Sequence, residues 1–186
     1  MTTFIMLPGI GGSGEDHWQT LWERSHPSMK RFTPPDWDKP ELSEWRRALQ
    51  DAIDAADPPV ILVAHSLACL LVAHWAIESR STVAGAFLVS VPDPEASAFP
   101  SAASSFKGVP STSLPFPSVI IASTNDPYGS IDYMQKRARE WNSELVNIGK
   151  HGHINGSSNL AEWSEGKSLL RDFVDGLGLR GLEMNS

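Results

Sequence analysis

Short apolar segments alternate with amphipathic segments along this chain. The apolar segments, rich in Val, Ile and Leu, predict strands, and the amphipathic ones, whose apolar positions recur with helical spacing, predict helices. Strands that are apolar throughout and alternate with helices indicate a parallel sheet covered on both faces. We therefore predict an α/β fold, a three-layer α/β/α sandwich around a six-stranded parallel sheet. The predicted strands are residues 3–7, 30–34, 60–64, 83–91, 119–122 and 144–148, and the predicted helices are about 15–25, about 41–56, from just after 66 to about 79, from 130 to 141 and about 160–175.

One long connection lacks this pattern. Residues 92–117 contain six prolines and many serines and have no clear periodicity. Connections of this length are more often functional than idle, and in a parallel sheet this one would lie beyond the carboxyl ends of the strands, where ligands bind. Because no linker or internal repeat divides the chain, we predict a single domain over residues 1–176 and a flexible C-terminal tail over 177–186.

Composition limits the classes of function. The formal net charge of −7 argues against a protein that binds nucleic acid. No apolar run approaches the length of a membrane span, and the N-terminus lacks the pattern of a signal peptide. Cys69 is the single cysteine and cannot form an intramolecular disulfide. We expect it to be a small core residue and expect the protein to be cytoplasmic.

The most informative segment is the apolar run that begins at Val60 and ends at Ser66, with a helix-compatible apolar run directly after it. A strand that turns sharply into a helix at a serine is a nucleophile elbow, which holds the serine hydroxyl clear of the backbone. The usual motif is Gly-x-Ser-x-Gly, because the strand and the helix nearly collide at the turn. Here Ala64 and Ala68 take the two glycine positions. A methyl group is the smallest departure from having no side chain.

Two further residues complete a candidate catalytic triad. A serine hydroxyl becomes an effective nucleophile only when a base takes its proton and an acid orients that base. In the α/β-hydrolase plan the three residues occur in the order Ser, Asp or Glu, His, each just after a strand. Ser66, Asp126 and His153 meet this requirement, because they follow the third, fifth and sixth predicted strands. Asp93, after the fourth strand, is the rival acid, and His151 is the rival base.

The same chemistry requires an oxyanion hole. Its donors are usually the backbone N–H of the residue after the nucleophile and a second N–H from the loop after the first strand. Leu67 would provide the first donor. In the Gly-rich loop of residues 8–14, Ile10 is the best candidate for the second donor and Gly11 is the next. This loop does not indicate a P-loop, because no Lys-Ser/Thr follows it.

Motifs along nearly the whole chain point to one family. They are Pro8-Gly9 with the Gly-rich loop, His17-Trp18-Gln19, Trp37 with Pro40 and Trp45, His65-Ser66-Leu67, Leu114-Pro115-Phe116-Pro117, Ser123 to Tyr128, and Gly152-His153-Ile154-Asn155. With them the chain resembles the small serine hydrolases of the retinoblastoma-binding-protein/YdeN type. That resemblance implies that Ser66 is the nucleophile, Asp126 the acid and His153 the base. We accordingly expect an α/β-hydrolase fold without a large cap domain and with the strand order 2-1-3-4-5-6.

We therefore predict a cofactor-free serine hydrolase that cleaves an ester, or an amide, of a small acyl substrate through an acyl-enzyme on Ser66. The alternative hypothesis is a module of the same fold that binds a protein partner and has little or no catalytic activity, since a fold does not determine a function. His17 and Trp18, near the oxyanion loop, are candidate contacts with the substrate, whereas His65 is expected to be structural. No metal site is predicted, because an isolated His-x-His with scattered carboxylates lacks the spacing of zinc motifs.

Overall fold

A single parallel sheet forms the centre of the molecule. The structure, a computed structural model, describes residues 1–79 and 82–179. Within them six strands form one sheet in the order β2-β1-β3-β4-β5-β6, and every neighbouring pair is parallel. Both the predicted sheet and its predicted strand order are confirmed. The strands are β1 (Thr3–Leu7), β2 (Met29–Arg31), β3 (Val60–His65), β4 (Gly85–Val89), β5 (Ser118–Ala122) and β6 (Glu144–Asn147).

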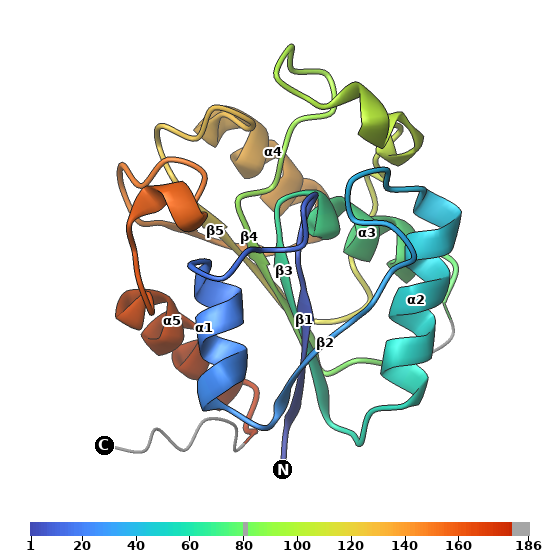
Figure 1. Cartoon of the computed structure of the whole chain (residues 1–186), viewed down its shortest axis with the longest axis vertical. Coiled ribbons are helices and arrows are strands. Elements are labelled where there is room, and N and C mark those ends of the chain that lie inside the picture. The colour runs from blue at the N-terminus through green and yellow to red at the C-terminus, as the bar shows by residue number, and fades with distance from the viewer. Residues whose placement is uncertain (80–81, 180–186) are drawn as a thin grey trace.

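Helices cover the two faces of the sheet (Figure 1). α1 and α5 pack on one face, and α2, α3 and α4 pack on the other. This arrangement is the predicted three-layer sandwich. The helices are α1 (Trp18–Ser25), α2 (Leu42–Asp54), α3 (Leu67–Ala76), α4 (Ile131–Trp141) and α5 (Ser164–Gly176), with short 3-10 helices η1 (Ser101–Phe106) and η2 (Gly156–Ser158).

Three predicted helix boundaries were wrong by several residues. The first helix begins at Trp18 rather than near 15, because the preceding residues form a turn in which the N–H of His17 donates to the carbonyl of Gly14. The Nδ1 atom of His17 then accepts from the N–H of Gln19 and caps the helix. The last helix begins at Ser164, after a left-handed residue at 163, and α3 ends at Ala76.

The strands differ in how deeply they are buried. All residues of β1, β3, β4 and β5 are buried, in keeping with their sequences, which are apolar except for Thr3, His65 and Ser118 at the strand ends. β6, at one edge of the sheet, has no fully buried residue. The long connection of residues 92–117 carries η1 and adds no large cap domain. Of the tail predicted at 177–186, residues 180–186 lie outside the described residues.

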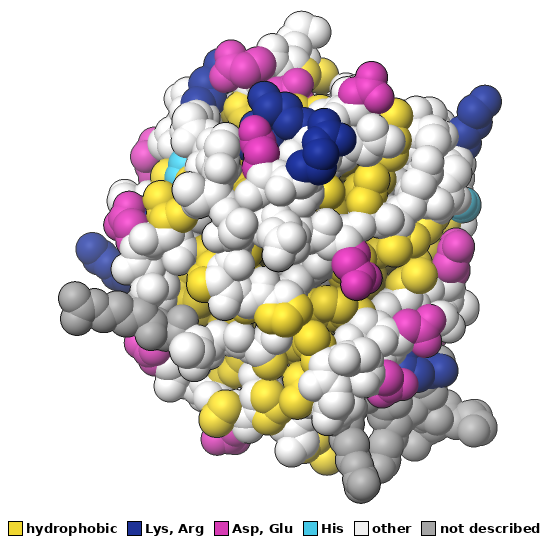
Figure 2. Space-filling model, turned by 180° about the vertical axis from the view of Figure 1, so that it is seen from behind, with side chains coloured by type: hydrophobic (Ala, Val, Ile, Leu, Met, Phe, Trp, Pro, Cys, Tyr) yellow, Lys and Arg dark blue, Asp and Glu magenta, His cyan; other side chains and the backbone are white. Residues whose placement is uncertain are grey.

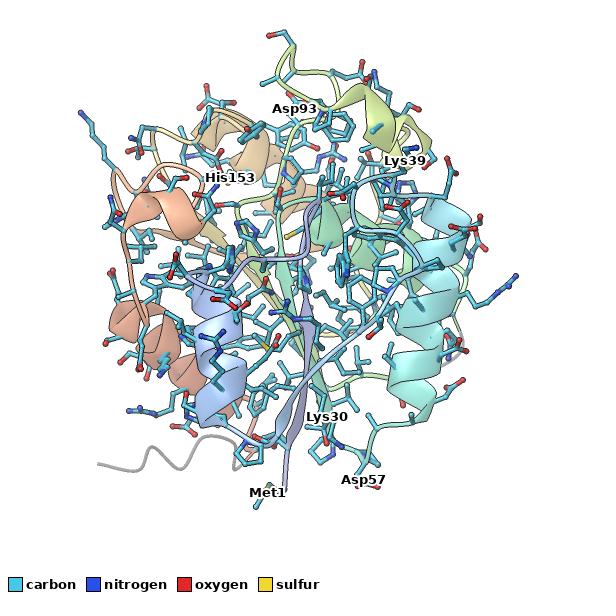
Figure 3. The ribbon with its side chains drawn as sticks, in the orientation of Figure 1. Met1, Lys30, Lys39, Asp57, Asp93 and His153 are labelled. Carbon is cyan, nitrogen blue, oxygen red and sulfur yellow. The ribbon has the colours of Figure 1, made fainter. Side chains whose placement is uncertain are left out.

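The figures show how side chains are distributed over the two ends and the rear surface of the molecule. Figure 3 shows His153, Asp93 and Lys39 toward the end where the strands finish, and Met1, Lys30 and Asp57 at the opposite end. From behind, positive side chains gather near the top together with Asp and Glu side chains, and hydrophobic side chains are exposed over the middle (Figure 2). None of the described helices has the length and apolar character needed to cross a membrane.

Candidate active site

Ser66 lies at a sharp turn between β3 and α3. Its backbone angles are φ 56° and ψ −124°, a conformation that is unfavourable for a residue with a side chain. Two hydrogen bonds hold the turn: the N–H of Ser66 donates to the carbonyl of Val89, and the N–H of Cys69 donates to the carbonyl of Ser66, each at 2.9 Å. Ala64 and Ala68 are both fully buried beside it. The predicted strand–serine–helix turn therefore forms with alanine at both flanking positions.

A chain of hydrogen bonds leads away from the Ser66 hydroxyl. Its Oγ lies 2.8 Å from Nε2 of His153. Nδ1 of the same ring lies 2.8 Å and 2.9 Å from the two carboxylate oxygens of Asp126. Because an ionised carboxylate only accepts, Nδ1 carries the proton, and the lone pair of Nε2 faces the Ser66 hydroxyl. The structure thus brings together the three residues that the sequence singles out.

The rivals for the acid and the base lie outside this chain of hydrogen bonds. A carboxylate oxygen of Asp93 accepts from the N–H of Glu95 at 2.9 Å and so closes a local turn. The backbone N–H of His151 donates to Oγ of Ser123 at 2.9 Å. Across the described part of the chain, no hydrogen bond joins the side chain of Asp93 or His151 to Ser66 or His153.

Two backbone N–H groups near Ser66 are suited to an oxyanion. Leu67 is the first residue of α3, so its N–H has no partner within the helix. In the loop after β1, the N–H of Gly11 already donates to the carbonyl of Trp37 at 3.1 Å, whereas the N–H of Ile10 makes no such bond to any of the described residues. The geometry therefore favours Ile10 over Gly11 as the second donor.

A cleft of about 650 Å³ opens at Ser66 and His153. Its walls come from the loop after β1, from Pro92, Phe99 and Pro100 of the long connection, from Tyr128, and from the segment that follows His153. The predicted position of the long connection, beyond the carboxyl ends of the strands, is confirmed. Glu15 and Asp16 stand exposed at this cleft, and none of the described residues that line it is Lys or Arg.

Comparison with known proteins identifies the family. Residues 4–172 match the family model described as serine hydrolase. The chain belongs to the serine hydrolase family. A crystal structure from Pectobacterium atrosepticum, of a protein described as a YdeN-like hydrolase, has 30% sequence identity and a TM-score of 0.85, over 95% of this chain and 92% of that one. The predicted YdeN-type family and α/β-hydrolase fold are confirmed.

Two more distant structures share the fold of this serine hydrolase. The ydeN gene product of B. subtilis has 18% identity and a TM-score of 0.76, over 94% of this chain and 100% of that one. Est1E from Butyrivibrio proteoclasticus, solved with ferulic acid bound, has 14% identity and a TM-score of 0.67, over 92% of this chain and 89% of that one. No curated protein matches the chain in sequence.

The two predicted substrate contacts occupy different places in the hydrolase. His17 is among the residues that line the cleft, with 6% of its surface exposed. Burial, with a smaller effect of the nearby Arg31 charge, lowers the pKa of His17 to about 3, so its ring is neutral. Trp18 does not line the cleft: it is 1% exposed and packs against Trp22 and Trp163. Its indole Nε1 donates to the carbonyl of Ile154 at 2.8 Å, so it contacts the loop that carries His153 instead.

The structure also shows where the single cysteine lies and whether a metal ion could be held. Cys69 is fully buried in α3, as expected for a core residue, and burial raises the pKa of its thiol above the ordinary value. In the part of the chain that the structure describes, no three His, Cys, Asp or Glu side chains come together in a way that could hold a metal ion.

Proposed function

We propose that this hydrolase cleaves carboxylic esters of small acyl groups through an acyl-enzyme formed on Ser66. The observation that carries the proposal is the unbroken hydrogen-bond chain from Ser66 through His153 to Asp126 at the cleft. The side chains of His153 and Asp126 are 9% and 0% exposed. Such shielding from water strengthens the electrostatic interactions within a catalytic triad.

In the first half of the reaction, Nε2 of His153 takes the proton of the Ser66 hydroxyl while Oγ attacks the ester carbonyl carbon. Asp126 keeps the ring in the required tautomer and stabilises the imidazolium that forms. The carbonyl oxygen becomes an oxyanion and accepts from the N–H groups of Leu67 and Ile10. Each such donor supplies about 3–4 kcal/mol of transition-state stabilisation. His153 then gives its proton to the leaving alcohol, and the acyl group remains on Ser66.

In the second half, water replaces the alcohol. His153 takes a proton from the water as its oxygen attacks the acyl carbon. The second oxyanion binds at the same two N–H groups and collapses with return of the proton to Oγ of Ser66. The products are the free carboxylic acid and the original enzyme, and no cofactor takes part in this sequence.

The apolar and acidic side chains that line the cleft favour esters with a particular kind of leaving group. Ile10, Phe99 and Pro100 provide apolar contact for an acyl or alkoxy group. The charged side chains at the rim are Glu15 and Asp16. No Lys or Arg is among the described lining residues, and the nearby Arg24 lies 3.9 Å from a carboxylate oxygen of Glu15. Like charges repel, so an ester with a neutral or cationic leaving group suits this cleft better than an anionic one.

Labelling with a fluorophosphonate probe tests the proposal. The probe is expected to form one adduct on Ser66, and the adduct is expected to disappear in Ser66→Ala. Ser90→Ala is the matched control, because Ser90 also follows a strand and has a φ of 56°, yet its side chain is fully buried. The control should retain labelling and turnover of short p-nitrophenyl esters.

Absence of both labelling and turnover in the wild-type protein would favour the alternative, a binding module of the same fold. A panel of matched esters, thioesters and amides then ranks the acyl bonds that are cleaved. Amide cleavage that exceeds ester cleavage would change the substrate class without changing the assignment of Ser66.

A further inference from the structure

His65 lies directly before the proposed nucleophile, and none of the steps above uses it. Its side chain is 5% exposed, and its ring centroid lies 4.7 Å from that of His17 and 5.0 Å from that of His153. Its Nε2 atom lies 2.9 Å from the backbone carbonyl oxygen of His153. The residue before Ser66 therefore contacts the main chain of the residue that faces Ser66.

The chemistry of the two atoms fixes the direction of this hydrogen bond. A carbonyl oxygen only accepts, so Nε2 of His65 must donate. Burial lowers the pKa of His65 well below its ordinary value, so the ring is neutral and carries a single N–H. That proton is therefore on Nε2, and Nδ1 is unprotonated.

The loop that receives this bond has a backbone that needs support. His153 stands between two residues with positive φ, Gly152 at 59° and Ile154 at 48°. Positive φ is unfavourable for a β-branched residue such as isoleucine and persists only where the surroundings hold it. The N–H of Gly152 donates to Oδ1 of Asn125 at 2.8 Å, and the carbonyl of Ile154 accepts from Trp18 at 2.8 Å. His65 holds the carbonyl of His153, which lies between these two anchors.

We propose that His65 is a positioning residue, which sets the distance and angle between the His153 ring and the Ser66 hydroxyl by holding the main chain of His153. This inference rests on the proposed function, because it assigns His153 as the base. His65 and Ser66 are consecutive, so one dipeptide presents the nucleophile and also holds its base. Proton transfer is sensitive to displacements of well under an ångström, so loss of the bond affects the reaction more than substrate binding.

Two substitutions at the same position separate the hydrogen bond from packing. His65→Leu removes the donor, and we expect kcat to fall about 10- to 100-fold while KM changes less than about twofold. His65→Gln places an amide N–H close to the former Nε2 position, and we expect it to recover most of the lost kcat. Loss of activity that glutamine does not restore, with both variants folded, would overturn the assignment.

His74 provides the matched control. It is also a buried histidine, and its Nε2 lies 3.1 Å from the backbone carbonyl of Phe106, away from the triad. His74→Leu and His74→Gln are expected to change the unfolding temperature but to leave kcat within about twofold of the wild type. An equal fall in kcat in the His74 and His65 series would mean that both act through stability alone, against the proposal.

The tautomer of His65 can be measured in the wild-type protein, so this test does not depend on the folding of a variant. Long-range nitrogen–proton NMR of the histidine side chains is expected to show His65 as the Nε2–H tautomer. The Nδ1–H tautomer would overturn the proposal. The proton between Nδ1 of His153 and Asp126 gives a second signal. Its chemical shift should change in His65→Leu and return to the wild-type value in His65→Gln.

Failure of the proposed function is distinguishable from failure of this inference. If wild-type protein neither reacts with a fluorophosphonate nor cleaves esters, the hydrolase assignment fails. The proton signal then decides the positioning role by itself. A signal that is unchanged in His65→Leu would overturn that role, and a signal that shifts in His65→Leu and returns in His65→Gln would support it.

Discussion

Gly9 approaches Ser66 so closely that a β-carbon built on Gly9 would lie 3.0 Å from the β-carbon of Ser66. The same added atom would lie 3.2 Å from the carbonyl oxygen of His65 and 3.5 Å from the nitrogen of Leu67. The loop after β1 therefore rests directly on the turn at Ser66. This contact brings the backbone of Ile10, the next residue, toward the first N–H of α3.

Gly9→Ala should consequently lower activity. The added methyl group would push the loop outward by a few tenths of an ångström and move the N–H of Ile10 relative to the oxyanion. We expect kcat to fall about 10- to 100-fold, because such donors act only at well-defined distances. Gly176→Ala is the control, since its new methyl group would meet no heavy atom within 4 Å. Steady-state kinetics with a p-nitrophenyl ester measure both, and a Gly9→Ala enzyme within twofold of the wild type would contradict the proposed oxyanion hole.

Asp126→Asn should reduce kcat about 10⁴-fold with little effect on folding, because asparagine fills the same space but favours the wrong tautomer of His153. Asp93→Asn tests the rival acid with the same chemical change. We expect the Asp93 variant to keep its activity, since that carboxylate accepts from the N–H of Glu95 instead. If the Asp93 variant loses activity and the Asp126 variant does not, the acid has been assigned to the wrong strand end.

The charge of the cleft rim predicts substrate selectivity. We compare two esters with the same acyl group, one with a trimethylammonium and one with a sulfonate on the leaving group. The ratio of their kcat/KM values, cationic over anionic, should exceed one. The double variant Glu15→Gln/Asp16→Asn should reduce that ratio about 3- to 10-fold at low ionic strength, and added salt should reduce it in the wild type. Glu165→Gln/Asp172→Asn makes the same charge change on α5 and should leave the ratio as it is. A wild-type ratio that is independent of salt would contradict this prediction.

The buried histidines predict acid sensitivity. His17 and His65 have folded-state pKa values below those of unfolded histidine, so between about pH 6.5 and the folded values the unfolded chain binds more protons. Their contribution to stability is therefore complete above about pH 6.5 and is lost as the pH falls. The free energy of unfolding should decrease by roughly 1 kcal/mol per pH unit for each histidine between pH 6 and pH 5. Urea unfolding of wild type and His65→Gln tests this, and the variant should have the shallower slope. Equal slopes would mean that His65 is not neutral in the fold.

Much of the fold follows from the sequence, because it depends on local patterns. The apolar run at residues 3–7 predicts a buried strand, and β1 has those bounds. Boundaries of helices were harder to predict. α1 begins at Trp18 because the ring of His17 caps it, and histidine is not a residue that predicts a cap.

The candidate site was predictable only in part, for a related reason. Ser66, Asp126 and His153 each follow a strand, which is a local signal. The sequence ranks Ile10 ahead of Gly11 as the second donor, but it could not show the physical reason, which is that the N–H of Gly11 donates to the carbonyl of Trp37. The hydrogen bond of His65 joins it to a residue 88 positions later, and no spacing rule reports such a contact.

His153, the proposed base, is carried by the loop after β6, the least buried strand of the sheet, which pairs on one side only. Four side chains from elsewhere in the chain, those of Trp18, His65, Ser123 and Asn125, hold this loop. The proposed base therefore depends on the outermost part of the sheet, whereas the proposed nucleophile follows β3, a strand inside it. In mild denaturant, hydrolysis should cease before the far-UV circular dichroism changes, because activity reports the opening of one edge and circular dichroism reports the unfolding of the helices and the sheet.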